Sequence, residues 1–306
     1  MQTRAMGPGA GWTWLKRAIN LGRNNPKALF GAAALLMVVA LIPSLIQLFA
    51  QYGLGMSDMS TMLWITGVTT LAMLVVYPLL IGGFFRVIDA TEHEQPTHAT
   101  ALFDTFKAGQ GRGRLIGFGL LLTLIYVVVL VAIFGGLGSG FAAWYWEVIT
   151  ATQSAQPGTP PVVPPMPPGF GMVFGLTLLV MMFLGGVYSI GFGQVALTQR
   201  TVGGALADGF TGALKNLLPL LVLTVILIVL MIVVALILGI VVGLLAVIGG
   251  LIHPALGFAL AMPVYIGFLV VTYVVMFGVM YFMWRDIAGE SRVDAGGAAT
   301  DHQVEL

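Results

Sequence analysis

The sequence predicts an all-α polytopic membrane protein with six transmembrane helices and both termini in the cytoplasm. Three observations predict this fold class. The 306 residues are 58% hydrophobic and only 8% charged, whereas about a quarter of the residues in soluble domains are charged. Six apolar runs are long enough to cross the roughly 30 Å hydrocarbon core of a bilayer. All thirteen Lys and Arg residues lie in alternate intervals between these runs, as expected of segments that stay in the cytoplasm.

The predicted transmembrane domain covers residues 29–284. Its spans lie at about 29–49, 62–85, 115–137, 172–197, 217–247 and 256–284. The basic residues of the alternate intervals are Arg4, Lys16, Arg17, Arg23 and Lys27, then Arg86, Lys107, Arg112 and Arg114, then Arg200 and Lys215, and finally Arg285 and Arg292. The stretch 217–284 is long enough for three short spans, but a seventh span would place Arg285 and Arg292 outside. Two long helices in this stretch are therefore favoured.

Residues 1–28 predict a basic amphipathic helix on the cytoplasmic side. At 100° per residue, Trp12, Trp14 and Leu15 fall on one half of the helix, and Lys16 and Arg17 fall on the other. Such a helix lies in the plane of the headgroups, where anionic lipids attract its basic residues. The residues expected at the lipid interface are Trp12, Trp14, Lys16, Arg17, Arg23 and Lys27.

Two further segments outside the spans have unusual compositions. The periplasmic interval at about 147–171 contains seven prolines and is expected to form a stiff, extended connector. The cytoplasmic tail 285–306 mixes acidic residues with Gly and Ala, which predicts disorder.

An internal repeat is the next prediction. Residues 101–106 read Ala-Leu-Phe-Asp-Thr-Phe and residues 205–210 read Ala-Leu-Ala-Asp-Gly-Phe, so four of six positions match. Each segment is amphipathic at the helical period and precedes a pair of spans, as the 1–28 helix does. The chain is therefore predicted to contain three repeats of one interfacial amphipathic helix plus two transmembrane helices.

Several local motifs carry a resemblance to a known family. They are Gly11-Trp12-x-Trp14, Arg23-Asn24-Asn25-Pro26, the Leu-Phe-Asp-x-Phe element, and the ending Met280-Tyr-Phe-Met-Trp-Arg-Asp-Ile287. With these motifs the chain resembles a family of uncharacterised proteobacterial inner-membrane proteins. It is distantly similar to the membrane domain of membrane-bound glycerophosphodiester phosphodiesterases. The resemblance implies a multi-pass protein of the bacterial inner membrane, and its motifs are topological and not catalytic.

Motifs for chemistry are missing from the sequence. The chain has no cysteine, which excludes disulfides and thiolate chemistry. Glu92, His93, Glu94 and His98 are the only cluster of metal-ligand residue types, but Pro96 interrupts it and its spacing matches no defined metal site. No cofactor motif and no catalytic motif occurs, and the net charge of +1 gives no support for nucleic-acid binding. We therefore expect a protein that is not an enzyme and holds no cofactor or metal.

Four Gly-x-x-x-Gly pairs predict close helix packing, because two glycines one turn apart let helix backbones approach. They are Gly113 with Gly117, Gly136 with Gly140, Gly171 with Gly175, and Gly239 with Gly243. The partner helix is expected to lie mainly within the same chain, although a homo-oligomer or another membrane protein could also supply it.

The predicted spans contain no ionisable Asp, Glu, Lys, Arg or His, which disfavours a proton-coupled pump. The leading functional hypothesis is a non-enzymatic scaffold or accessory in envelope or lipid processes, with anionic membrane lipids as partners. The alternative is a passive transporter or channel for a small or lipid-like substrate. Its expected intramembrane polar site would be Tyr77, Thr70, Gln194 and Thr272, whose other role is hydrogen bonding between helices.

Overall fold

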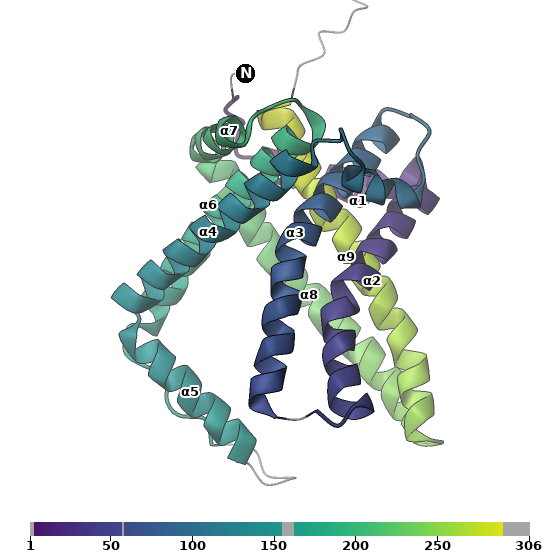
Figure 1. Ribbon diagram of the computed structural model, residues 1–306, viewed down its shortest axis with the longest axis vertical. Coiled ribbons are helices and arrows are strands. Elements are labelled where there is room, and N and C mark those ends of the chain that lie inside the picture. Colours follow the sequence, from purple (N-terminus) through teal and green to yellow (C-terminus); the bar gives the residue numbers. More distant parts are fainter. Residues whose placement is uncertain (1–2, 57, 155–161, 290–306) are drawn as a thin grey trace, which may run out of the picture.

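The computed structural model describes residues 3–56, 58–154 and 162–289 of the chain (Figure 1). Throughout these residues the regular secondary structure is helical. Six helices are long and apolar enough to cross a membrane, which confirms the predicted number of spans. They are α2 (Pro26–Leu48), α3 (Met59–Glu92), α4 (Arg112–Gly136), α6 (Phe170–Leu197), α8 (Leu217–Gly250) and α9 (Pro254–Ile287).

Shorter elements connect the long helices. Helix α1 (Ala10–Asn20) and the 3-10 turn η1 (Leu21–Arg23) precede α2, which continues into the π-helical stretch η2 (Phe49–Gly53). The 3-10 helix η3 (Ala99–Phe106) precedes α4, α5 (Ser139–Ser154) follows α4, and α7 (Val202–Lys215) precedes α8. Figure 1 shows the N terminus, α1 and α7 at one end of the bundle, which we call the short-helix end.

Local capping explains why several long helices begin before the predicted spans. The side chain of Asn25 accepts a hydrogen bond from the backbone N–H of Ala28, and Pro26 occupies the first helical position. Asp58 caps α3 in the same way, by accepting from the N–H of Thr61 at 2.8 Å. These bonds satisfy N–H groups that a helix leaves free at its start. The helices therefore extend into polar sequence that a hydropathy window excludes.

Three of the short elements, α1, η3 and α7, each pack mainly against two long helices that do not follow them directly in the chain. Helix α1 packs against α8 and α9, η3 packs against α2 and α3, and α7 packs against α6 and α4. The long helices also pair as α2 with α3, α4 with α6, and α8 with α9. In Figure 1, α4 and α6 lean away from α3 toward the end opposite the short helices.

The core lies mainly in the half of the bundle nearest the short-helix end. Buried residues are concentrated at 28–37 in α2, 78–91 in α3, 115–122 in α4 and 184–196 in α6. The largest fully buried side chains are Trp14, Tyr281, Phe84, Phe85, Phe118, Phe192 and Phe282. The opposite half exposes apolar side chains such as Leu63, Val131 and Ile237. A bilayer is the solvent that accepts such a surface.

A close backbone contact fixes η3 to α3. A Cβ atom added to Gly83 would overlap the backbone carbonyl of Leu102, so glycine is required at this point of α3. The hydroxyl of Thr105 donates to the carbonyl oxygen of Leu79 at 2.8 Å and adds a buried polar bond to the same contact. The segment expected to be an amphipathic α-helix is instead a 3-10 helix that packs on protein.

The interval after α4 differs from the extended connector predicted at 147–171. Helix α5 continues to Ser154, because no proline occurs in its sequence to interrupt it. The described prolines at 162–168 do lack regular structure, and the indole N–H of Trp144 donates to the carbonyl of Pro164 at 3.1 Å. Residues 155–161, like residues 290–306 of the predicted tail, lie outside the described residues, and the first residues of that tail belong to α9.

Candidate functional site

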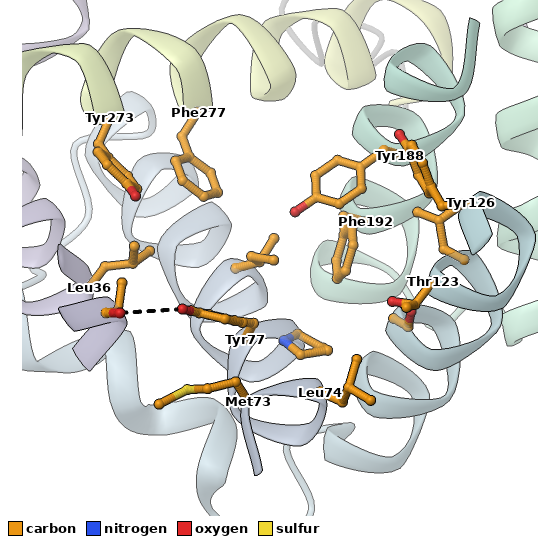
Figure 2. A pocket seen from close by; sticks show the side chains of 15 residues that line it. Leu36, Met73, Leu74, Tyr77, Thr123, Tyr126, Tyr188, Phe192, Tyr273 and Phe277 are labelled. Atoms are coloured by element: carbon orange, nitrogen blue, oxygen red, sulfur yellow. Dashed lines mark hydrogen bonds between the residues drawn. The ribbon is translucent and has the colours of Figure 1, made fainter. Parts of the chain in front are cut away.

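A cavity of about 360 Å³ lies between the long helices (Figure 2). Five of the six candidate spans form its wall, and α8 does not contribute. The lining residues are Leu36 and Ala40 from α2; Met73, Leu74, Tyr77, Pro78 and Ile81 from α3; Gly119, Leu122, Thr123 and Tyr126 from α4; Tyr188 and Phe192 from α6; and Tyr273 and Phe277 from α9. None of these residues carries a charge, so the site is suited to an uncharged or apolar molecule.

Three of the four lining tyrosines have the same spacing from an arginine. The pairs are Arg114 with Tyr126, Tyr188 with Arg200, and Tyr273 with Arg285, each twelve residues apart. At a rise of 1.5 Å per residue this spacing corresponds to about 18 Å along a helix. Half of the hydrocarbon core measures about 15 Å. The cavity therefore lies near the middle of the bilayer when these arginines lie at its surface.

The polar atoms of the cavity are mainly phenol hydroxyls. The hydroxyl of Tyr77 donates to the carbonyl of Ala40 at a long 3.5 Å, and the hydroxyl of Thr123 donates within its own helix. The hydroxyls of Tyr126, Tyr188 and Tyr273 have no hydrogen-bond partner among the described residues. Figure 2 shows the Tyr188 ring extending from α6 toward the wall that carries Tyr273 and Phe277.

Aromatic rings pack beside the cavity on the side of the short-helix end. Phe118 packs edge-to-face on Phe192 with ring centroids 5.0 Å apart. Phe84 packs on Phe277 in the same way at 4.8 Å. Phe84 and Phe118 are fully buried. Phe84 and Phe118 thus add buried apolar packing next to the lining residues Phe277 and Phe192.

The wall between α3 and α4 depends on a glycine. A Cβ on Gly119 would overlap the ring of Pro78, so the two helices are in direct contact beside the cavity. Farther toward the opposite end, Leu71 on α3 is 66% exposed and Leu124 on α4 is 59% exposed. The cavity is thus bordered by apolar helix faces that a bilayer would cover with lipid chains.

No family model, no curated protein and no solved structure matches this chain. The site is therefore interpreted from its own geometry.

The four residues of the expected polar site are not brought together. Tyr77 lines the cavity. Thr70 is exposed, and the hydroxyl of Thr272 donates to the carbonyl of Phe268 in its own helix. The Gln194 amide is buried and donates to Asp208 at 3.2 Å, toward α7. The expected site also lacked Tyr126, Tyr188 and Tyr273, although the sequence places each of them twelve residues from an arginine.

The expected lipid-interface residues divide into two groups. Trp12 is 54% exposed, and Lys16, Arg23 and Lys27 are also exposed. The prediction is wrong for Trp14, which is fully buried because the apolar face of α1 packs on α8 and α9 instead of lipid.

Arg17 also departs from the interface prediction. Its guanidinium pairs with Asp286 at 2.8 Å and lies over the Phe282 ring, 4.1 Å from the centroid. A side chain engaged in this way is directed toward α9 and only partly toward headgroups.

Other charged groups at the short-helix end are also paired. Arg200 donates two hydrogen bonds to Asp208, at 2.7 and 3.0 Å, and these bonds raise the pKa of the guanidinium. Glu92 accepts from Arg285 at 3.2 Å. Among the described residues, no three His, Asp or Glu side chains are arranged to hold a metal ion. Of the acidic residues that were considered for metal chemistry, Glu92 is therefore the partner of an arginine.

Proposed function

We propose that this chain is a multi-pass protein of the bacterial inner membrane that holds a lipid-like molecule in the cavity without converting it. One observation carries the proposal. An uncharged cavity with free phenol hydroxyls lies at mid-depth of the long helices and is bordered by exposed apolar faces. An amphipathic lipid reaches such a site by lateral movement within the bilayer. This role belongs to the class of non-enzymatic accessories in envelope or lipid processes.

The charge distribution supports an orientation with both termini in the cytoplasm. Every described Lys and Arg lies in a short element, in an adjoining loop, or in the terminal turns of a long helix at the short-helix end. Positive charges near span ends are retained in the cytoplasm. The exposed Lys16, Arg23 and Lys27 would then face the anionic lipids of the inner leaflet.

The packing order supports the threefold repeat. In each unit the short element leads into one pair of long helices and packs against the pair of the preceding unit. The first unit has no unit before it in the chain, and its short element α1 packs instead against α8 and α9 of the last unit. The three units therefore form a closed ring. The local sequence match between 101–106 and 205–210 fits this arrangement.

The aromatic layer favours holding a molecule over passing it across the membrane. A passive transporter needs a continuous route, and the fully buried rings of Phe84 and Phe118 occupy the core next to the cavity, on the side of the short-helix end. A lateral site for a lipid needs no such route. The resemblance to six-helix membrane domains with no catalytic motif is compatible with this role and is part of the proposal.

Native mass spectrometry of the detergent-purified chain tests the proposal. We expect the wild-type protein to retain bound lipid after detergent exchange. Ala40→Phe adds a large ring to the cavity wall and should abolish retention. Val38→Phe adds similar bulk two residues away, at a position that is 56% exposed, and should retain lipid as the wild type does. Equal lipid retention by the two variants, or no lipid on the wild type, would refute the proposal.

A further inference from the structure

The cavity contains hydrogen-bonding capacity that the protein itself does not use. The hydroxyls of Tyr188 and Tyr273 come from opposite walls, on α6 and α9, and neither has a partner among the described residues. These two hydroxyls are not fully buried, since among the described residues only the indole nitrogen of Trp284 is a fully buried side-chain polar atom without a partner. They are therefore available to a molecule in the cavity, where a hydrogen bond contributes a modest net stabilisation. A bound molecule with suitable oxygen atoms would supply the missing acceptors.

Both tyrosines are held by neighbouring aromatic rings. The Tyr188 ring lies 4.6 Å from the Phe192 ring, centroid to centroid. The Tyr273 ring is stacked near Phe277 at 6.4 Å. Ring packing restricts the side-chain torsions, so the two hydroxyls are positioned before a ligand arrives. Preorganised donors of this kind select for acceptor position in the ligand.

The absence of charge from the lining restricts the headgroup. All fifteen lining residues are neutral. The arginines of these helices are not among the lining residues. Arg114 and Arg285 lie twelve residues, about 18 Å along the helix, from Tyr126 and Tyr273, and Arg86 donates to the carbonyl of Ala196 and to Gln110. A phosphate group at this depth would be buried without a counter-charge. The part of the ligand inside the cavity must therefore be uncharged.

The volume indicates how much of a lipid enters. About 360 Å³ is near the lower limit of ordinary small-molecule sites. A whole lipid with two long chains does not fit, but its polar linkage region does. The chains would then lie along the exposed apolar faces of α3 and α4, where Leu71 and Leu124 are found.

Resting on the proposed function, we infer that the cavity is selective for an uncharged ester-linked lipid, with Tyr188 and Tyr273 donating hydrogen bonds to its carbonyl oxygens. The carbonyl oxygens of such lipids project from the linkage as acceptors. The ether oxygens of a dialkyl analogue replace only the bridging ester oxygens, so no acceptor remains at the carbonyl position. A diacylglycerol and its dialkyl ether analogue share the glycerol hydroxyl and the chains. They differ only in the carbonyl groups.

Binding of these two probes to the detergent-solubilised full chain tests the inference. We expect the wild type to bind diacylglycerol at least about 10-fold more tightly than the dialkyl analogue. Tyr188→Phe and Tyr273→Phe should each weaken diacylglycerol binding by about 5- to 10-fold and leave the ether analogue unchanged. Tyr145→Phe, at an exposed position of α5, should change neither. Each substitution removes only an oxygen atom without a partner, and thermal unfolding verifies that the variants are folded.

The possible outcomes separate this inference from the proposed function. If both probes bind equally and the tyrosine substitutions have no effect, the carbonyl selectivity is wrong, while loss of binding in Ala40→Phe would still support a lipid site. If neither probe binds and lipid retention does not depend on Ala40, both the inference and the proposed function fail.

Discussion

The indole N–H of Trp14 donates a 3.0 Å hydrogen bond to the Asp286 carboxylate, 272 residues later in the chain. The same carboxylate accepts two hydrogen bonds from Arg17, at 2.8 and 3.0 Å. This contact joins α1 to the last turn of α9, where Arg4 also donates its backbone N–H to the carbonyl of Ile287. The first and last described elements are therefore connected by charge-assisted bonds, which are stronger than neutral ones.

Asp286→Ala should destabilise the protein substantially. The change leaves the buried indole N–H of Trp14 without its acceptor, at an expected cost of about 1–3 kcal/mol in the free energy of unfolding. Thermal unfolding in detergent should therefore show a lower Tm. Asp104→Ala is the matched control, because its pair with Lys107 is largely exposed and should contribute less than about 1 kcal/mol. Equal Tm changes for the two variants would contradict this interpretation.

Gly83→Ala should disrupt the contact between α3 and η3. The new Cβ would overlap the Leu102 carbonyl, and the backbone cannot move aside as a flexible side chain would. We expect a loss of about 1–3 kcal/mol, typical of overpacking. Gly67→Ala lies in the same helix with open space around its position, so it should be neutral or stabilise the helix by up to about 1 kcal/mol. If Gly83→Ala and Gly67→Ala have the same Tm, the backbone contact between Gly83 and the Leu102 carbonyl is not close.

Hydropathy was sufficient to predict the six spans because length and apolar content alone decide whether a helix can cross a bilayer. The hydropathy pattern underestimated the length of α3, because the predicted span ended at residue 85 and the helix continues to Glu92. The last turns of α3 carry Arg86 and Glu92, whose partners Gln110 and Arg285 come from distant parts of the chain. Partners of that kind depend on tertiary packing and cannot be recognised from a local window.

The position of Trp14 shows a second limit. A helical period separates an apolar face from a polar one, but lipid chains and a protein core are equally apolar. Nothing local therefore distinguishes the exposed Trp12 from the buried Trp14. The Gly-x-x-x-Gly pairs likewise do not say which surface they contact. A Cβ atom added to Gly239 or Gly243 would meet no atom of the described residues within 4 Å.

The cavity could be predicted only in part. Tyr77 was recognised as a polar residue at mid-span, but convergence of five helices on one point depends on their crossing geometry. The close approach of Pro78 to Gly119 is one determinant of that geometry. The twelve-residue spacing between tyrosine and arginine gives the depth of each residue but not its rotation about the helix axis.

Reporter fusions test the proposed orientation. Fusions after Gly109 and Gln199 should report a cytoplasmic location, because both positions adjoin basic residues at the short-helix end. A fusion after Asp58, at the start of α3 and away from that end, should report a periplasmic location. Alkaline phosphatase and green fluorescent protein fusions give opposite signals in the two compartments. A periplasmic signal from Gly109 or Gln199 would overturn the orientation.

Asp58 should make the start of α3 sensitive to acid. Hydrogen bonds from Thr61 and Ser60 lower the pKa of its carboxyl from 3.8 to about 2. A carboxyl whose pKa is lower in the folded state stabilises that state fully above pH 3.8, and the contribution is lost as the pH falls through about 2. Carbon-detected NMR of the Asp58 carboxyl should give a titration midpoint near 2.

Asp58→Asn separates the cap from its titration. Asn is as good an N-cap as Asp but carries no titratable proton, so the variant should retain α3 at neutral pH and lose the part of the acid response due to this residue. Asp58→Ala should instead fray the first turn at every pH, because no side chain accepts from Thr61. Amide hydrogen exchange at Thr61 distinguishes the three forms. Protection should be pH-dependent between about 2 and 4 in the wild type, independent of pH in Asp58→Asn, and low throughout in Asp58→Ala. A midpoint near 3.8 in the folded protein would mean that the carboxylate does not cap this helix.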